Sequence, residues 1–270
     1  MAVIQGVDYS FDHPTPAELQ QAGKKFACRY VYPHSQAPNT KNLTRAEATA
    51  LQAHGVEVVS NFESTSGRAM AGFNAGRDDA RVASLQHGEC GGPKDRPIYF
   101  SVDIDTAPSD YPKLDQYLKG VASVLGVART GVYGEYDLVK HAMDNGLVGR
   151  SSSAGFFWAW QTYAWSAGKY DERCACAQDK NNVKLGSGTV DLDSAHCPDY
   201  GQWGFKAVTK PPVKPPAKPP VKPPAKPPDK PRPKGQEVGK VGDTHLILWD
   251  TGDLTVRKAG KHLYTVPRGK

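Results

Sequence analysis

The sequence predicts an α/β fold: a (β/α)8 barrel of the TIM type, followed by a Pro/Lys-rich linker and a small β-rich C-terminal segment. Three observations predict it. Short apolar runs alternate with helix-like stretches through residues 1–209, which is the pattern of a parallel sheet. Six of these runs end in a carboxylate or an amide, as expected where strands deliver side chains to one rim. A repeat of Lys and Pro then ends the alternation.

The strands are predicted from runs rich in β-branched and aromatic residues. Those with a polar end are residues 6–8, 58–63, 98–105, 131–135, 157–161 and 190–193. A seventh strand is expected at residues 26–32. An eighth, needed to close the barrel, is expected between Gln161 and Val190, where the polar sequence gives no clear bounds.

Helices are predicted between the strands, from the spacing of apolar residues and from helix-start signals. Their ranges are residues 16–23, 44–54, 67–86, 111–125 and 136–145. The second begins with Thr44-Arg45-Ala46-Glu47, a capping-box pattern in which Thr44 caps the helix and Glu47 reaches back.

Residues 210–234 follow a Lys-Pro-Pro-x repeat. Proline fixes φ and has no backbone donor, so this segment can join neither a helix nor a sheet. We predict an extended polyproline linker of ~3.1 Å per residue, on the order of 70 Å long. A ligand for SH3-type domains is the alternative, but the regularity of the repeat favours a spacer.

Residues 235–270 form the predicted tail, with short strands at residues 245–249, 254–257 and 262–266. A segment of this size is short for a stable core of its own. A cell-wall-binding module, a sheet that needs a partner and a remnant of a larger domain all fit the pattern.

The positive charge lies outside the predicted barrel. The linker holds seven Lys and one Arg against one Asp, the tail six basic against four acidic residues, and the whole chain carries +6, which leaves −3 for residues 1–209. Enzymes of nucleic acids concentrate basic residues on the globular face, so a nucleic-acid partner is not expected. A basic spacer would be attracted to an anionic cell wall.

No run approaches the ~20 apolar residues of a membrane span. The N-terminus lacks a basic region followed by an apolar one, so we expect a protein made in the cytoplasm without a signal peptide. It would then reach the cell wall by lysis-linked or nonclassical release. The five cysteines include no Cys-x-x-Cys pair and specify neither disulfides nor a metal site, although pairing or metal binding by Cys174, Cys176 and Cys197 stays open.

The polar strand ends suggest carbohydrate chemistry. Hydrolysis of a glycosidic bond uses two carboxyl groups, one protonated and one charged. Asp103 and Asp105 are expected at alternate positions of one strand, on one face and roughly 6–7 Å apart at Cβ. Such neighbours repel, which raises the pKa of one of them and lets it serve as the acid.

In a closed barrel, Asp8 and Glu63 should converge on the same mouth as Asp103 and Asp105, which completes the predicted catalytic set. Aromatic faces interleaved with amides and carboxylates suit sugars. The predicted substrate-binding residues are Arg29, Tyr133, Glu135, Trp160, Gln161, Asp191 and Asp193. Arg29 has an alternative role, which is to pair with one of the acids.

Several of these motifs together resemble a known family. Gly6-Val7-Asp8-Tyr9-Ser10, Arg29-Tyr30, residues 100–105, 131–134 and 190–196 are similar to the bacterial and phage "glycoside hydrolase-like" TIM-barrel domain, itself related to the family 25 glycoside hydrolases, the lysozyme-type muramidases. The resemblance covers residues 3–205. It implies a site at the C-terminal rim of the barrel, with peptidoglycan as the substrate.

By matching motifs, Asp8, Asp103 and Asp105 fall where the muramidases carry a strand-one Asp and a strand-four acidic pair. The muramidases have Glu, their proton donor, at the position of Asp105. The proton donor is therefore left open between Asp105 and Glu63, with Asp103 and Asp8 stabilising positive charge or orienting the substrate.

The leading expectation is a peptidoglycan-degrading glycoside hydrolase, an endolysin-like muramidase that cleaves β-1,4 bonds as a monomer without a cofactor. A non-catalytic barrel that binds cell-wall glycan is one alternative. A hydrolase of another polysaccharide, such as chitin, is the other.

Overall fold

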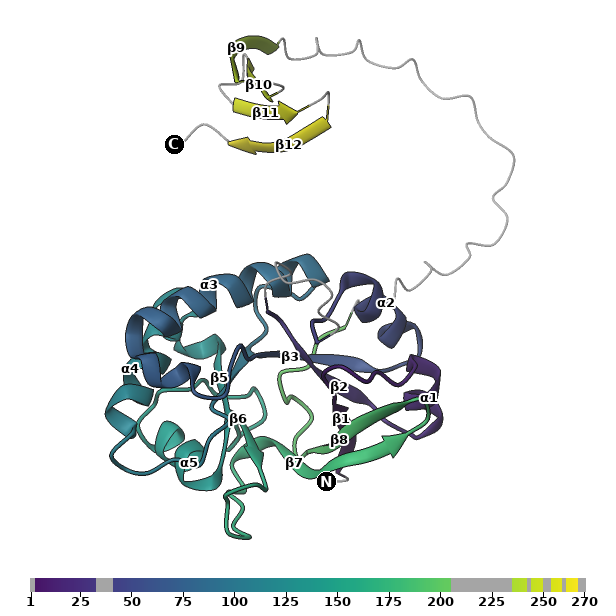
Figure 1. Cartoon of the computed structure of the whole chain (residues 1–270), viewed down its shortest axis with the longest axis vertical. Helices are drawn as coiled ribbons and strands as arrows, with labels where there is room; N and C mark the ends of the chain where they lie inside the picture. The colour runs from purple at the N-terminus through teal and green to yellow at the C-terminus, as the bar shows by residue number, and fades with distance from the viewer. Residues whose placement is uncertain are drawn as a thin grey trace, which may run out of the picture. The chain divides into compact units, whose positions relative to one another are not determined.

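The computed structural model describes residues 3–32, 41–204, 235–241, 244–249, 254–258 and 261–266 (Figure 1). The chain divides into two compact units, Met1–Thr209 and Lys210–Lys270. The division falls where the Lys/Pro repeat begins. The conformation predicted for residues 210–234 lies outside the described residues, so the extended linker stays a prediction.

Eight strands close the barrel of the first unit. They are β1 (Ile4–Asp8), β2 (Phe26–Tyr30), β3 (Glu57–Phe62), β4 (Ile98–Ser101), β5 (Thr130–Gly134), β6 (Phe157–Thr162), β7 (Cys174–Leu185) and β8 (Gly188–Ala195). The seven strands with predicted ranges are confirmed, but β4 ends at Ser101, four residues before its predicted end. The eighth, β7, lies in the interval that the barrel required.

The last strand departs from the expected parallel sheet. β8 runs antiparallel to both of its neighbours, β7 and β1, whereas β1 to β7 pair in parallel. Only Gly186 and Ser187 separate β7 from β8. Two residues can join an antiparallel hairpin, but a parallel neighbour needs a crossover of a dozen or more. The residues at the start of β8, and not its end, therefore reach the rim of the barrel.

The five predicted helices are confirmed with small shifts at their ends. They are α1 (Pro16–Gln21), α2 (Arg45–Ala53), α3 (Gly72–Cys90), α4 (Tyr111–Leu125) and α5 (Tyr136–Asp144), with short 3-10 turns η1 (Arg68–Ala71) and η2 (Val127–Arg129). In the described part of the barrel unit, no helix follows β6.

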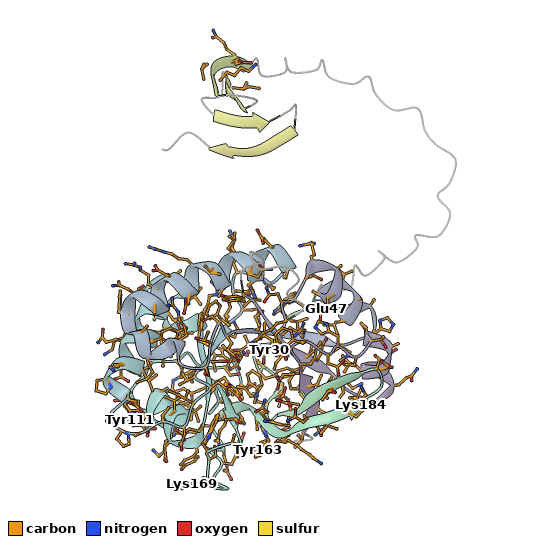
Figure 2. All side chains as sticks on the ribbon, in the orientation of Figure 1. Tyr30, Glu47, Tyr111, Tyr163, Lys169 and Lys184 are labelled. Atoms are coloured by element: carbon orange, nitrogen blue, oxygen red, sulfur yellow. The ribbon has the colours of Figure 1, made fainter. Side chains whose placement is uncertain are left out.

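The predicted capping box of α2 is half correct. The Thr44 hydroxyl accepts a hydrogen bond from the Glu47 amide. The Glu47 carboxylate instead accepts from Arg29 Nε at 2.7 Å and from the Tyr9 hydroxyl at 3.1 Å. Figure 2 shows Glu47 toward the periphery by α2 and Tyr30 at the centre of the barrel unit. The Glu47 carboxylate therefore pairs with Arg29, a buried cation on β2, and not with the start of its own helix.

The barrel interior is filled below its mouth by large side chains, among them Phe26, Tyr99 and Trp160. All five cysteines are buried free thiols, including Cys174, Cys176 and Cys197. The interior is therefore a packed core and not a channel.

The second unit contains an antiparallel sheet in the order β12-β11-β10-β9. Its strands are β9 (Gly235–Val241), β10 (Thr244–Trp249), β11 (Leu254–Lys258) and β12 (Lys261–Val266). The three predicted strands are confirmed. β9 was not predicted because its two glycines and its charged residues give a weak strand signal. In the described part of the chain, no helix is both long and apolar enough to span a membrane.

Candidate active site

A pocket of about 190 Å³ opens at the C-terminal ends of the parallel strands and is lined by four carboxylates. Asp8 ends β1, Glu63 follows β3, Asp103 follows β4 and Asp191 lies near the start of β8. The rest of the wall consists of Ser10, Tyr30, Lys41, Asn61, Ser101, Tyr133, Trp160, Gln178 and Asn181. We call this cavity the acid pocket.

A neighbouring cavity of about 260 Å³ extends the acid pocket. The two share Asp8, Ser10, Tyr30 and Asp191. Each is smaller than the roughly 300–1,000 Å³ typical of ligand pockets, but the shared wall makes them parts of one polar groove.

Asp8 is the most buried acid of the acid pocket, at 3% exposed. Gln178 Nε2 donates to its Oδ2 at 2.8 Å, and the Tyr30 hydroxyl donates to Oδ1 at 3.4 Å. Asp191 stands directly opposite in the β1–β8 register. Burial and then the charge of Asp191 raise the pKa of Asp8 to about 7, although the hydrogen bond from Gln178 lowers it in part.

Gln178 connects two of the acids. Its Nε2 donates to Asp8 and also to Asp191 Oδ2, at 3.1 Å. Its Oε1 accepts from the Tyr133 hydroxyl at 3.0 Å and from Thr162 Oγ1 at 2.8 Å. Two hydroxyl donors on the carbonyl side fix the orientation of the amide, because only its NH2 group can face the carboxylates.

Glu63 and Asp103 form the other side of the acid pocket. Glu63 Oε1 lies 2.7 Å from Lys41 Nζ, and this ammonium also lies 4.4 Å from the centre of the Tyr30 ring. Asp103 is half-buried. Burial raises its pKa, as do the charges of Glu63 and Asp191, while Lys41 opposes them. Asp103 thus combines access to the pocket with a tendency to hold a proton.

Six predicted site residues meet in the acid pocket: Asp8, Glu63, Asp103, Tyr133, Trp160 and Asp191. Asp193 lies beneath it, fully buried, and accepts a hydrogen bond from Trp160 Nε1 at 3.2 Å. Burial raises the pKa of Asp193 well above its ordinary value. Its position supports the floor of the pocket and gives a ligand no access.

The prediction that Asp103 and Asp105 share one face of a strand is wrong. β4 ends at Ser101, so both residues lie on the loop after it, with a bend at Ile104 between them. Asp105 is exposed and does not line the acid pocket. The strand period of two applies only as far as the strand extends.

Glu135 and Arg29 do not face the acid pocket either. Glu135 is the N-cap of α5, and its carboxylate accepts hydrogen bonds from the amides of Asp137 and Leu138. Arg29 is completely buried and pairs with Glu47 of α2, so it pairs with an acid, but not with one of the site acids named for this role from the sequence. Neighbouring residues on a strand face opposite sides, so Tyr30 points into the barrel and Arg29 points out toward α2.

Gln161 is also directed away from the acid pocket. Its Nε2 donates to the carbonyl of Lys169 at 2.8 Å, and its Oε1 accepts from the amide of Asp171 at 2.9 Å. Both ends of the side chain therefore hold the loop between β6 and β7.

Sequence reasoning missed several residues of the acid pocket. Asn61 and Ser101 stand two positions before Glu63 and Asp103, and Asn61 Nδ2 donates to Ser101 Oγ at 2.8 Å. Strand alternation from the acids back into β3 and β4 is a signal that could have found them. Gln178 gave no such signal, because β7 had no predicted bounds.

Comparisons with known proteins show the family of the barrel unit. Residues 17–197 match the family described as "Rv2525c-like, glycoside hydrolase-like domain". A Mycobacterium tuberculosis protein named "Putative peptidoglycan hydrolase Rv2525c" is 28% identical over 207 residues, 73% of this chain and 82% of that protein.

Solved structures give the same result. The crystal structure of the Tat-secreted protein Rv2525c of M. tuberculosis, in complex with L-tartrate, has a TM-score of 0.67 and 27% identity, covering 75% of this chain and 100% of that one. The bacterial lysozyme from Streptomyces coelicolor has a TM-score of 0.50 and 16% identity, covering 72% and 93%, and shows a shared fold alone. The resemblance predicted from the strand-end motifs is confirmed, and the chain belongs to the Rv2525c-like family of glycoside hydrolase-like domains.

Proposed function

We propose that this protein hydrolyses β-1,4 glycosidic bonds of bacterial peptidoglycan in the acid pocket. The observation that carries the proposal is the acid pocket itself, in which four carboxylates of unequal environment surround one cavity. Glycosidases need one carboxyl that holds a proton and another that stays charged. The name of the M. tuberculosis relative supports peptidoglycan as the substrate.

Asp103 is the best candidate for the proton donor. It is half-buried at the pocket wall and its pKa is raised, so it can hold a proton and still reach a bound sugar. Asp105, one of the two donors expected from the sequence, lies outside the pocket. Glu63, the other, has its carboxylate 2.7 Å from the Lys41 ammonium, so it is already engaged by a group of the pocket wall.

Asp191 is the acid that would stabilise positive charge at the anomeric carbon, and Asp8, whose pKa is raised to about 7, would orient the substrate. Gln178 holds both carboxylates toward the cavity. Tyr133 supplies aromatic surface in the same wall, and aromatic faces suit the C–H faces of sugars. Trp160 is 1% exposed and closes the floor of the pocket. Orientation of the substrate would follow from the polar groups of the remaining wall.

The place of action is also inferred from the M. tuberculosis relative. The M. tuberculosis relative is described as Tat-secreted, and peptidoglycan lies outside the cytoplasmic membrane. We therefore propose that this protein acts at the cell wall after export. The route of export, including the signal-free release expected from the sequence, stays a prediction.

The direct test is to incubate the purified protein with isolated bacterial cell walls, count new reducing ends and identify the released fragments by mass. Muropeptides ending in reducing N-acetylmuramic acid support the proposal. New reducing ends from chitin but none from cell walls would move the substrate to another polysaccharide.

Two matched substitutions locate the proton donor. Asp103→Asn should lower the rate at least ~100-fold, the low end for general acid–base catalysis. Asp105→Asn, a change of the same chemistry two residues away, should leave the rate within about threefold because exposed carboxylates outside the site contribute little. The opposite ranking would return the role to Asp105, as the resemblance implied.

A non-catalytic glycan-binding barrel is the second candidate. It is favoured by one observation: Asp105, which matches the muramidase proton donor, lies outside the acid pocket. Tight binding to several types of cell wall with no new reducing ends from any of them would support this candidate and contradict hydrolysis.

A further inference from the structure

A separate cavity of about 260 Å³ lies beside β7, under the loop that joins β6 to β7. Its wall includes Tyr163, Tyr170, Ala177, Gln178, Asp179 and His196. Trp160 faces the barrel interior, so the next residue of β6, Gln161, faces outward, and the cavity it lines lies on the outer surface of the barrel. TIM barrels cover this surface with a helix after each strand. Here a loop covers it instead.

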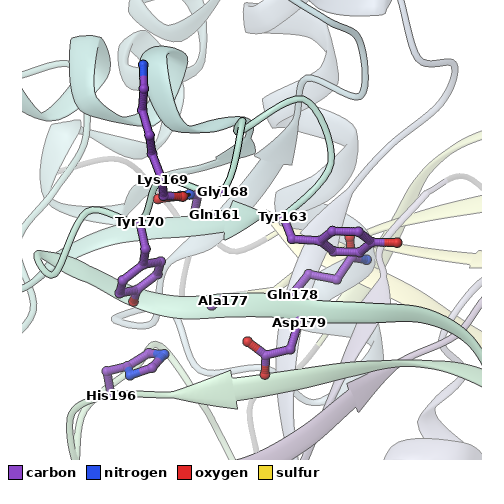
Figure 3. Close-up of a pocket in the computed structure, with 9 residues that line it drawn as sticks. All are labelled: Gln161, Tyr163, Gly168, Lys169, Tyr170, Ala177, Gln178, Asp179 and His196. Carbon is purple, nitrogen blue, oxygen red and sulfur yellow. Dashed lines mark hydrogen bonds between the residues drawn. The ribbon is translucent and has the colours of Figure 1, made fainter.

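Aromatic side chains are exposed along this loop. Tyr163 is 50% exposed, Trp165 46% and Tyr170 38%. The Tyr170 ring lies 5.1 Å from the imidazole of His196, and Figure 3 shows the two on either side of β7 at Ala177, with Asp179 farther along the strand. The cavity therefore has aromatic walls and a carboxylate at one edge.

The loop is held rigidly in an unfavourable conformation. Trp165 and Ala167 have φ angles of 56° and 50°, values that residues other than glycine seldom adopt. Gln161 binds the loop backbone at Lys169 and Asp171, and Ser166 Oγ donates to the carbonyl of Thr162. Strained backbone that its surroundings enforce is concentrated at binding sites. The exposed rings are thus displayed in a fixed arrangement.

The cavity and the acid pocket are neighbours that share one lining residue. Gln178 lines both this cavity and the acid pocket. The backbone amide of Tyr163 also donates to the carbonyl of Gln178, at 3.1 Å. A polymer that lies in the acid pocket needs to pass only one strand to reach Tyr163.

We propose that this cavity is an accessory subsite for a pyranose ring of a glycan strand. Sugar rings stack their C–H faces on aromatic rings, which Tyr163 and Tyr170 provide, and the Asp179 carboxylate can accept hydrogen bonds from sugar hydroxyls. The identity of the glycan as peptidoglycan rests on the proposed function. The site itself rests on the cavity, the exposed rings and the fixed loop.

The test uses calorimetry to measure how tightly the full-length protein binds peptidoglycan glycan chains without peptides. One chain has two sugars and the other has eight. All variants carry Asp103→Asn, so that cleavage does not shorten the ligand. Tyr163→Ala should weaken binding of the long chain about tenfold, the order of one aromatic contact, and leave the disaccharide unchanged. Tyr163→Phe keeps the ring and should restore long-chain affinity. Phe73→Ala, an exposed aromatic on α3, is the matched control.

The results separate this inference from the proposed hydrolysis. Loss of long-chain affinity in Tyr163→Ala supports the subsite even if the protein with Asp103 intact releases no reducing ends from cell walls. Equal affinities of Tyr163→Ala and Phe73→Ala for the long chain overturn the subsite, even if cell walls are cleaved. An eight-sugar chain that binds no more tightly than the disaccharide overturns it as well.

Discussion

At the residue scale, Asp8 shows how a charged group in a pocket can destabilise the folded protein. A carboxylate that is 3% exposed and faces Asp191 is less favourable when charged than the same group in the unfolded chain. Folding therefore favours the protonated form of Asp8. Under the proposed function, the pocket retains this group because glycoside hydrolysis needs carboxyl groups at the reacting centre.

Replacement of Asp8 should show how much its charge destabilises the folded protein at each pH. Its pKa is about 7 in the folded protein against an ordinary value of 3.8. The folded state binds the proton more tightly, so the charge of Asp8 destabilises the protein increasingly as pH rises through this window. Asp8→Asn should therefore be more stable than the wild type near pH ~8, with the difference vanishing near pH ~4.

Urea unfolding of both proteins across this pH range measures the difference. Asp105→Asn, which removes an exposed carboxyl, is the control. A difference between Asp8→Asn and the wild type that is the same at every pH would contradict the destabilising charge.

Gln178 gives a second prediction at this scale. Its hydrogen bond lowers the pKa of Asp8, so Gln178→Met, which keeps the size of the side chain but removes the amide, should raise the pKa of Asp8 further. NMR titration of the Asp8 carboxyl measures this directly. The pH–rate profile of hydrolysis should move in the same direction.

Gln116→Met, on the exposed face of α4, should leave the titration of Asp8 unchanged. If Gln178→Met also leaves it unchanged, then the amide does not act on Asp8.

At the scale of elements, the ends of strands and helices decide which polar residues face the site. β4 stops at Ser101 and the chain bends at Ile104, so Asp103 lines the pocket and Asp105 does not. α5 begins at Tyr136, and backbone amides of its first turn donate hydrogen bonds to the carboxylate of Glu135. A helix start leaves backbone donors without partners, and a carboxylate just before it satisfies them.

Glu135 should accordingly matter for stability and not for ligand binding. Glu135→Ala removes the acceptor of two backbone amides, so it should lower the free energy of unfolding by about 1 kcal/mol, the usual cost of losing an N-cap. Glu89→Ala, an exposed change on α3, should cost far less. Denaturant unfolding gives both values. Weaker binding of glycan by folded Glu135→Ala at unchanged stability would restore the substrate-binding role predicted from the sequence.

At the scale of the whole molecule, charge is divided between the parts of the chain. Residues 210–234 hold seven Lys and one Arg against one Asp, whereas residues 1–209 are mildly acidic. An acidic barrel unit is repelled by an anionic cell wall, and a basic segment is attracted to it. The basic segment, residues 210–234, would then hold the protein near the cell wall, although it carries none of the predicted catalytic residues.

Removal of residues 210–270 should therefore weaken binding to isolated cell walls, and more at low salt than at high salt because salt screens the attraction. Co-sedimentation with cell walls over a range of salt concentrations measures this. A loss of binding that is the same at every salt concentration would assign the effect to the tail sheet, β9 to β12, and not to charge.

The sequence by itself determined the elements that local patterns specify. Apolar periodicity and capping signals located the helices and seven of the eight barrel strands, and the barrel itself required the eighth. The acids Asp8, Glu63 and Asp103 were found because each stands at the end of a strand, and the parallel strands of a barrel end at one rim.

Only the tertiary structure decided which polar residues meet in the acid pocket. The two-residue turn after β7 sets the direction of β8, but its pairing with β1, at the other end of the barrel sequence, is what brings Asp191 opposite Asp8. Gln178 joins Asp8 across 170 positions of the chain, a contact that no local pattern encodes. Arg29, Glu135 and Gln161 were drawn to partners nearby, because a buried polar group must satisfy its own hydrogen bonds before it can serve a ligand.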